Sequence, residues 1–554
     1  MQELDAKNQL LAVQTLEIIE TLIEAGNYMH DCVYNQKYEQ FETIANDIID
    51  ALHSLYSVAN DIKEEIPYIS TQVSCENLFY SINNIIRLVR VRSDRALSKI
   101  EFELIPLLQE FYYDFYFFTC VFGDKEREKK HYTEEFIKMG ANSYIDESIK
   151  TGKYKYDMSI YILAYNKLEY TKQCVESIIK YTPNNINYEL FFLNNGSSDG
   201  TQEYFESFKC NKEINLLKNS FSDIRAVRRI CEGRYVLSIS NDVIVTENYL
   251  NNLIKCIESD PKIAMVVPTT PNVSNLQSIP AQYSTLEEMH AFAKANNVSN
   301  PTHWEERVRL CNPLTFYRSD VFLSSGGVGA IDKYFVFSEF GDDALALRLR
   351  RAGYKMILAK DCYCYHFGSV TLKEAQIKEN TLKKSRRLFI ERYGVDAWST
   401  GFCYDPKLMG ALTLKLTRRV NILGINSGFG SNPLKIKTLH KEAGNQDADL
   451  FFVTDDERYV TDMQTYSDNV KYVNDVTVDV YDDISFDFIL LEGNVEKVIC
   501  LPDNFDKIKN KLTKGGILAI CATNDKEIKI LSKLNADETI TGHNCRWLLW
   551  YFKD

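Results

Sequence analysis

The sequence predicts an α/β protein made of three folding units: an all-α bundle over residues 1–150, then two units of alternating strands and helices over 151–400 and 401–554. The first observation is length, because 554 residues at roughly 100–200 per domain give about three to five domains. The second is composition, since 45% hydrophobic and 25% charged residues are typical of globular proteins. The third is periodicity: apolar residues recur at helical spacing in the first unit and in short β-rich runs after it.

The chain carries 64 Lys and Arg against 77 Asp and Glu, a formal net charge of −13. Because DNA and anionic bilayers attract basic surfaces, this balance argues against non-specific binding to either. The opening MQELDAKNQLLAVQ has no basic stretch before an apolar run, so we expect no secretory signal. A bilayer span takes about 20 apolar residues, and the run from Phe111 to Phe122 is interrupted by Asp114. We therefore expect a cytoplasmic protein with no transmembrane segment.

Fourteen cysteines are scattered through the chain without the paired spacing of a zinc site. The closest pair, Cys362 and Cys364, lies in the alternating run DCYCYHFG, which places both on one face of a strand. In a cytoplasmic protein we expect such cysteines to be reduced structural thiols rather than disulfides or metal ligands.

The first unit has apolar residues at helical spacing in LLAVQTLEIIETLIEAG, FETIANDIIDALHSLYSVA and NLFYSINNIIRLVRV. This pattern predicts four or five helices joined by short polar breaks. No cluster in the unit has the composition of a catalytic site, and we expect His30, His53 and His131 to be packing or surface residues. The unit is therefore predicted to serve packing, homo-oligomer formation or recognition of a partner.

From about Lys155 strands and helices alternate, beginning with MSIYILAYN, a helix through TKQCVESIIKYT and then YELFFLNNGSSDGT. In a parallel α/β sheet, ligands bind at the carboxyl ends of the strands. The turn after the second strand opens a helix, so it can bind a polar ligand through backbone N–H groups or can be purely structural. The residues at these two strand ends are Ala164, Tyr165, Asn166, Asn194, Asn195, Ser197 and Asp199.

Two acidic segments follow. The apolar strand YVLSISNDVIV is broken at Ser240, Asn241 and Asp242, where the acid can hold Mg²⁺ or Mn²⁺ or can be a turn aspartate. In GDDALALRLRRAGY, Asp342 and Asp343 open an amphipathic helix, where the helix dipole favours carboxylates. Two acids directed into a cleft would equally suit a general base.

The order of ILAYN, NNGSSDGT, SND, GDDALALRLRRAGY and HFGS over residues 157–395 resembles glycosyltransferase family 2, whose domains have the GT-A nucleotide-diphospho-sugar transferase fold. The resemblance implies a Mn²⁺ or Mg²⁺ site at Asp242 and His366. It implies a catalytic base at Asp342 or Asp343, and alignment with the family motif favours Asp342. It also implies a set of nucleotide-sugar-binding residues, which are Ala164, Tyr165, Asn166, Asn194, Asn195, Ser197, Asp199, Arg225 and Asn241.

The chain departs from the family pattern at three places. Asn194 stands where an Asp is common, which leaves the base of the donor nucleotide open. The metal motif is Ser-Asn-Asp, so Asp242 is its single carboxylate, and we expect a metal held weakly together with the donor diphosphate. Gly341 replaces the acid that usually precedes the base. The stretch LTFYRSDVFLSSGGVGAIDKYF resembles the acceptor-side segment of the family, and the residues that match its turn are Gly326, Gly327 and Asp332.

Residues 419–554 resemble a class I methyltransferase-like Rossmann domain, with VNILGINSGFG at the glycine-rich cofactor turn, FDFILLEG at a middle strand and LTKGGILAI at a later strand. Gly428 and Gly430 of the turn remain, while Asn426 replaces its first glycine. Asp455 and Asp456 are the candidates for the acid that binds the cofactor ribose. These departures favour a domain for packing or acceptor recognition over one that binds S-adenosylmethionine.

The motifs together predict an inverting glycosyltransferase that moves a sugar from a nucleotide-diphosphate donor to an acceptor hydroxyl. By analogy, the acceptor is a protein such as flagellin or a surface glycan. Two alternatives stay open. One is a non-catalytic scaffold with the glycosyltransferase fold, which the departures at Asn194, Asn241 and Gly341 motivate. The other is a bifunctional glycosyltransferase and methyltransferase.

Overall fold

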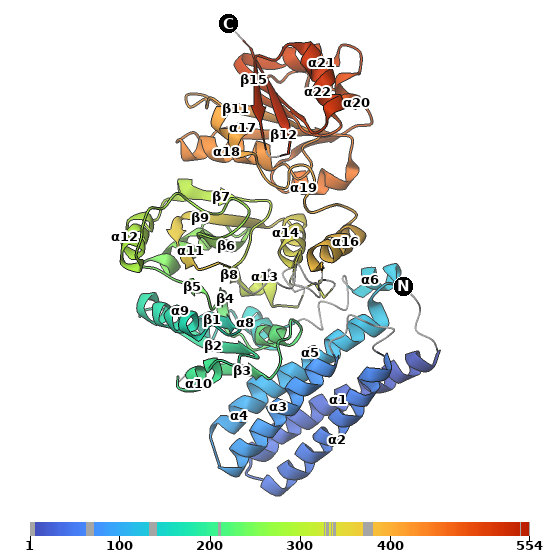
Figure 1. The fold of residues 1–554 in the computed structure, drawn as a ribbon, viewed down its shortest axis with the longest axis vertical. Coiled ribbons are helices and arrows are strands. Elements are labelled where there is room, and N and C mark those ends of the chain that lie inside the picture. Colours follow the sequence, from blue (N-terminus) through green and yellow to red (C-terminus); the bar gives the residue numbers. More distant parts are fainter. Residues whose placement is uncertain are drawn as a thin grey trace.

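The structure is a computed structural model of the 554-residue chain. It describes residues 6–62, 71–131, 141–208, 212–325, 327, 332–333, 335, 339–368, 380–542 and 544–552. We call its three parts the helical unit (residues 6–151), the central unit (156–411) and the C-terminal unit (420–551). The helical unit packs against one side of the central unit, and the C-terminal unit lies on the opposite side (Figure 1).

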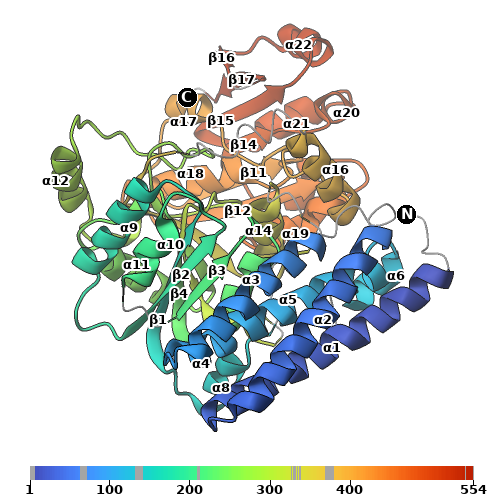
Figure 2. The same ribbon diagram turned by 60° about the horizontal axis from the view of Figure 1, so that its bottom comes forward.

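Long helices form the helical unit and run side by side in both views (Figures 1 and 2). Four of its segments follow one another without a break, because the residues at their junctions keep right-handed helical dihedrals, so residues 95–121 form one long helix with two π-helical stretches. The segments of the unit are α1 Ala6–Tyr34, α2 Tyr38–Ile62, α3 Thr71–Arg90, α4 Arg95–Lys99, η1 Ile100–Leu104, α5 Ile105–Tyr116, η2 Phe117–Val121, α6 Lys125–Lys130 and α8 Ser143–Thr151.

The central unit is built on an eight-stranded sheet of order β3-β2-β1-β4-β8-β6-β9-β7. Strands β3, β2, β1 and β4 are parallel, whereas β8 runs antiparallel to β4 and to β6. The strands are β1 Tyr156–Ala164, β2 Tyr188–Asn195, β3 Lys212–Leu216, β4 Gly233–Ser240, β5 Val243–Ile244, β6 Ile263–Thr269, β7 Trp304–Glu306, β8 Leu314–Arg318, β9 Lys355–Tyr363 and β10 Tyr365–His366.

Helices cover both faces of this sheet, which explains why its parallel strands read as almost continuous apolar runs. The helical elements of the central unit are α9 Leu168–Tyr181, α10 Thr201–Glu206, η4 Asp223–Arg229, α11 Tyr249–Glu258, α12 Leu286–Asn296, η5 Pro301–His303, α13 Ser319–Phe322, α14 Gly341–Arg351, α16 Thr381–Tyr393 and α17 Pro406–Ala411.

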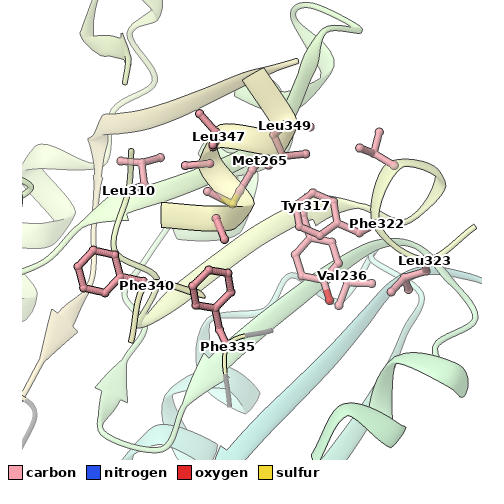
Figure 3. Close-up of a cluster of buried hydrophobic side chains, with 14 of the residues drawn as sticks. Val236, Met265, Leu310, Tyr317, Phe322, Leu323, Phe335, Phe340, Leu347 and Leu349 are labelled. Carbon is pink, nitrogen blue, oxygen red and sulfur yellow. The ribbon is translucent and has the colours of Figure 1, made fainter. Parts of the chain in front are cut away.

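Helix α14 carries both candidate acids and packs its apolar side on the sheet. Figure 3 shows Leu347 and Leu349 of α14 near Met265 of β6 and Tyr317 of β8, within one buried cluster. Phe340, directly before the helix, belongs to the same cluster. This packing holds α14 against the sheet.

The C-terminal unit contains a seven-stranded sheet of order β13-β12-β11-β14-β15-β17-β16. Its first five strands in this order are parallel, and β17 runs antiparallel to both β15 and β16. The strands are β11 Val420–Ile425, β12 Ala448–Thr454, β13 Asn469–Tyr472, β14 Phe486–Leu491, β15 Leu512–Ala522, β16 Glu538–Thr541 and β17 Arg546–Tyr551. The assignment of this unit to the methyltransferase-like class stays a prediction.

The helical elements of the C-terminal unit are α18 Ser431–Glu442, η6 Glu457–Tyr459, α19 Val460–Gln464, η7 Val478–Tyr481, α20 Val495–Ile499, α21 Asn504–Asn510, α22 Asp525–Leu531 and η8 Ser532–Leu534. Helix α18 packs against β7, an edge strand of the central sheet, and η1 of the helical unit packs against β3, the other edge. Both edges, which would otherwise expose unpaired backbone groups, are therefore covered by a neighbouring unit. Across the described ranges, no helix has both the length and the apolar character needed to cross a membrane.

Candidate functional site

The candidate site lies where β1, β2 and β4 end. Because β1 pairs in parallel with both neighbours, Ala164 lies opposite Asn194, and Leu163 lies opposite Ser240. The loops that follow these three strands therefore meet at one edge of the sheet. Ala164 is buried, while Tyr165, the next residue, is 38% exposed at that edge.

Two of the predicted binding residues bridge the first two loops. The backbone N–H of Asn166 donates to Ser197 Oγ at 2.8 Å, and the N–H of Leu168 donates to Asp199 Oδ2 at 2.8 Å. Burial raises the pKa of Asp199, but hydrogen bonds from Thr201 and from backbone N–H groups outweigh it and lower this pKa below its ordinary value. Ser197 and the Asp199 carboxylate thus hold the loops together.

Two further residues predicted to bind the donor have amide side chains that also form hydrogen bonds to neighbouring segments. Asn241 Nδ2 donates to the backbone oxygen of Asn166 and to Thr171 Oγ1, both at 2.8 Å. Asn195 Oδ1 accepts from the N–H of Ser220 at 2.8 Å. Side chains predicted to contact the donor therefore also build the loop framework around it.

Asn194 differs from these residues. Its Oδ1 accepts from the N–H of Ser197 at 3.0 Å, but its Nδ2 is buried and has no hydrogen-bond partner among the described residues. A buried donor without a partner costs free energy, of the order of 1–3 kcal/mol. An acceptor atom of a ligand at this strand end would remove that cost.

Asp242 and His366 come together from segments more than a hundred residues apart. Strand β10 pairs antiparallel with β5, which sets His366 opposite Val243. His366 Nε2 lies 3.3 Å from Asp242 Oδ2, while His366 Nδ1 is buried without a hydrogen-bond partner among the described residues. The carboxylate is 21% exposed, and the imidazole is buried.

This pair suits a divalent ion that is completed by other ligands. In the part of the chain that the structure describes, no group of three or more His, Cys, Asp or Glu side chains could hold a metal alone. Mg²⁺ and Mn²⁺ commonly combine one or two protein ligands with water and the oxygens of a bound phosphate. A carboxylate oxygen and an imidazole nitrogen at this edge fit that arrangement.

Asp342 opens onto a cavity of about 260 Å³ between the sheet and α14. Asp342 is exposed to the solvent of this cavity, and neighbouring protein atoms partly enclose its carboxyl group. This enclosure and the negative charge of Asp343 raise the pKa of Asp342 to about 6, although Arg309 and Asn312 act in the opposite direction. A carboxylate with this pKa is a suitable general base near neutral pH.

Asp343 points into a different environment. It is buried, and Arg309 Nε lies 2.9 Å from its Oδ1. Burial raises the pKa of Asp343, and the Arg309 charge lowers it in part. Asp343 lines a small cavity with Arg309 and Phe402 and does not line the larger one, so Asp342 alone of the two faces the space where a substrate could bind.

Several residues of the cavity were not among those predicted from the sequence. Asn312 Nδ2 donates to Asp342 Oδ1 at 3.2 Å, and Asn312 Oδ1 is buried without a hydrogen-bond partner among the described residues. Arg228 and Arg348 line the cavity together with the predicted Arg225. The segment CNP gives no signal for Asn312, whereas the basic run at Arg225, Arg228 and Arg229 between two strands was a signal that could have been used.

The residues that match the acceptor-side turn are only partly described. Gly326 lies outside the described residues. Asp332 is buried, lines the cavity and accepts a hydrogen bond from the hydroxyl of Tyr393 at 2.6 Å. The cavity wall thus includes an acid held by α16.

The glycine-rich turn of the C-terminal unit contacts the chain's own backbone. The N–H of Phe429 donates to the carbonyl oxygen of Thr400 at 3.1 Å, and the N–H of Ser431 donates to that of Gly401 at 3.1 Å. Asp455 follows β12, where Asn494 Nδ2 and Lys497 Nζ lie 2.9 and 2.8 Å from its carboxylate oxygens. Asp456 accepts hydrogen bonds from Arg458.

Two family models match the chain. Residues 159–307 match glycosyl transferase family 2, and residues 11–112 match a domain of unknown function (DUF8042). Part of the central unit is therefore similar to glycosyl transferase family 2. No curated protein matches the chain.

Solved structures resemble the chain weakly. GalNAc-T7 with UDP, GalNAc and Mn²⁺ is 13% identical over 38% of this chain and 44% of its own length, with a TM-score of 0.31. The mannosyltransferase PcManGT from Pyrobaculum calidifontis with GDP-Man and Mn²⁺ is 15% identical over 39% of this chain and 57% of its own, with a TM-score of 0.28. TarS 1–349 of S. aureus with UDP-GlcNAc is 15% identical over 44% of this chain and 68% of its own, with a TM-score of 0.32.

Proposed function

We propose that the protein is an inverting glycosyltransferase that transfers a sugar from a nucleoside-diphosphate donor to a hydroxyl group of a protein or glycan. The observation that carries this proposal is the Asp342 carboxyl group, whose pKa is raised to about 6 and which faces a cavity at the carboxyl edge of the sheet. The match of residues 159–307 to glycosyl transferase family 2 supports the reaction class.

The candidate base and the candidate metal site belong to adjoining segments. The N–H of Ser240 donates to the carbonyl oxygen of Pro313 at 3.0 Å. Asn312, whose amide donates to Asp342, directly precedes Pro313, and Asp242 lies two residues after Ser240. A donor with its diphosphate near Asp242 could therefore place its sugar toward Asp342.

In the proposed reaction Asp342 removes the proton of the acceptor hydroxyl. The acceptor oxygen then forms a bond to the anomeric carbon, and the bond from that carbon to the diphosphate oxygen breaks on the opposite face. Asp242 and His366 would hold Mn²⁺ or Mg²⁺, which neutralises charge on the leaving diphosphate. The nucleotide would lie against Ala164, Tyr165, Asn166 and the amide of Asn194.

The first experiment identifies the donor. A thermal-shift screen of UDP- and GDP-linked sugars, each with and without Mn²⁺, should show stabilisation by the donor that depends on the metal. The selected donor should also be hydrolysed slowly to the nucleoside diphosphate. Binding without any hydrolysis or transfer would favour the alternative of a non-catalytic scaffold.

The second experiment tests the base. Asp342→Asn should reduce transfer by about 10²- to 10⁴-fold, because general base catalysis contributes rate factors of this size, while the dissociation constant of the donor changes little. Asp242→Ala is the complementary variant and should weaken donor binding in Mn²⁺ but not in its absence. Full turnover by Asp342→Asn would remove Asp342 from this role.

A further inference from the structure

The segment from Lys218 to Arg229 forms one wall of the cavity that Asp342 faces. Its residues Phe221, Ile224, Arg225 and Arg228 all line the cavity. The segment contains only the short 3₁₀ helix η4, and Ser220 Oγ accepts a hydrogen bond from the N–H of Asp223 at its start, at 3.1 Å. Further contacts to the segment come from the helical unit, which lies behind it.

Helix α3 of the helical unit holds the start of the segment. Asn77 Oδ1 accepts from the N–H of Lys218 at 2.8 Å, and Asn77 Nδ2 donates to the carbonyl oxygen of the same residue at 3.2 Å. Asn77 Nδ2 also donates to Asp223 Oδ2 at 2.7 Å, and Ser74 Oγ donates to Asp223 Oδ1 at 2.8 Å. All three side chains are buried, so this side of the wall depends on hydrogen bonds supplied by α3.

Helix α5 holds the end of the segment through charge. Asp114 Oδ1 lies 3.7 Å from Arg225 Nη1, and Glu110 Oε1 accepts from Arg229 Nε at 2.6 Å. Lys333 Nζ joins the two acids, at 2.6 Å from Glu110 and 2.5 Å from Asp114. Burial acts to raise the pKa of Glu110, but Arg229 and Lys333 lower it to about 2, so the Glu110 carboxylate is charged at neutral pH.

These contacts are more than surface packing between two units. The five charged side chains are between 1% and 11% exposed, and burying charges is costly unless each is paired. Of the residues involved, Asp114 lies at ion-pair distance from Arg225, which lines the cavity. Helix α5 therefore contacts the segment that forms the cavity wall.

We infer that the helical unit is a working part of the donor site, in which α3 and α5 position the segment 218–229 and Asp114 is the positioning residue for Arg225. This inference rests on the proposed function for its consequence, the binding of a nucleoside diphosphate donor. It gives the helical unit a role within its own chain, in line with the packing role that its sequence predicts, while the oligomer contact and the external partner stay predictions.

The test is a double-mutant cycle in the full-length chain, with Asp114→Asn, Arg225→Gln and both together. The measured quantity is the dissociation constant of UDP and of GDP in the presence of Mn²⁺, after circular dichroism has established that each variant is folded. Asp114→Asn should raise the dissociation constant of the nucleotide that binds more tightly by about tenfold. The double variant should bind this nucleotide no more weakly than Arg225→Gln alone, because the effects of substitutions at contacting residues are not additive. Glu42→Gln, which removes an exposed carboxylate from α2 of the same unit, should leave binding unchanged.

A second measurement does not depend on donor binding. Asn77→Ala should raise amide hydrogen exchange in peptides covering residues 218–229 by tenfold or more relative to the unaltered chain, with little change in peptides from the C-terminal unit. Unchanged exchange in Asn77→Ala, or additive effects of Asp114→Asn and Arg225→Gln, would overturn the inference and leave the proposed function intact. Failure of the unaltered chain to bind any nucleoside diphosphate, including those with other bases than UDP and GDP, would instead contradict the proposed function, and the exchange result would still decide the positioning role.

Discussion

At the residue scale, Asp342 and Asp343 show how neighbours in sequence can differ in chemistry. Successive residues of an α-helix are rotated by about 100°, so the two carboxyl groups leave α14 in different directions. Asp342 reaches the cavity and Asn312, whereas Asp343 turns to Arg309 in the protein interior. The second acid then acts on the first through its charge.

This coupling predicts a shift in pH dependence for Asp343→Asn. The charge of Asp343 helps to raise the pKa of Asp342 to about 6, whereas Arg309 lowers it. Removing the acid leaves only the lowering charge, so the pKa of Asp342 should fall, and kcat/KM should be retained to lower pH than in the unaltered enzyme. The acidic limb of the pH profile of kcat/KM measures this. Asp479→Asn, in the C-terminal unit, is the control, and an unmoved limb in Asp343→Asn would contradict the coupling.

A second prediction at this scale concerns the effect of Glu492 on the pH dependence of stability. Burial raises the pKa of Glu492 to about 7, although Asn432 Nδ2 donates to its carboxylate at 2.6 Å. A pKa that is higher in the folded than in the unfolded state means that stability falls as pH rises from about 4.5 through 7. Glu492→Gln should therefore flatten this fall and be the more stable form at pH 8, by roughly 1–3 kcal/mol. Urea denaturation of both proteins at pH 5 and pH 8 measures it, and an equal difference at both pH values would refute it.

At the element scale, the turn between β11 and α18, whose sequence resembles a cofactor turn, contacts the backbone of the same chain. Gly428 has a φ of +54°, and a Cβ there would overlap the carbonyl oxygen of Thr400. The backbone N–H groups of Phe429 and Ser431 donate to the carbonyl oxygens of Thr400 and Gly401 in the central unit. The glycines of this turn therefore admit the backbone of the same chain.

Gly428→Ala should destabilise the protein by about 1–3 kcal/mol or more, because the side chain meets both an unfavourable φ and a close backbone neighbour. Thermal and urea unfolding measure the loss. Gly410→Ala in α17 is the matched control, since a Cβ there has nothing within 4 Å and should be neutral or slightly stabilising. Equal effects of the two substitutions would show that the close approach of Gly428 to Thr400 adds little to stability.

At the scale of the whole molecule, both neighbouring units reach the elements of the candidate site. The helical unit contacts the segment that carries Arg225, while Asp462 of α19 binds Arg350 and Arg351 at the end of α14, at 3.1 and 2.9 Å. The Asp462 side chain is fully buried. Helix α14 thus begins with the candidate base and ends in an ion pair with the C-terminal unit.

Asp462→Asn should cost on the order of 3 kcal/mol of stability, because it leaves Arg350 and Arg351 without the buried carboxylate that balances their charge. Asp479→Asn is again the control: its pair with Lys507 is exposed, so its loss should cost about 1 kcal/mol or less. Equilibrium unfolding of both variants gives the comparison. Similar losses would mean that the contact between α14 and α19 adds little to the stability of the molecule.

The sequence pattern predicted the order of the helices and strands and the positions of the strand ends. The apolar runs before Asn166, Asn194 and Asp242 correspond to β1, β2 and β4, and Asp342 lies in the first turn of α14. The edge coverage of the central sheet could not be predicted, because it depends on contacts between residues far apart in the chain. For the same reason the pattern did not reveal that Ser197, Asp199 and Asn241 hydrogen-bond to neighbouring loops.

The amino-acid sequence by itself determined the spacing of apolar residues in helices and strands, the turns and the chemical groups at the strand ends, since these depend on residues a few positions apart. The family resemblance implied that His366 and Asp242 lie together, whereas only the tertiary structure brought Asn312 beside Asp342 and Asp114 of the helical unit beside Arg225. The tertiary structure also decided the raised pKa of Asp342, because that value depends on enclosure and on charges brought from elsewhere in the chain.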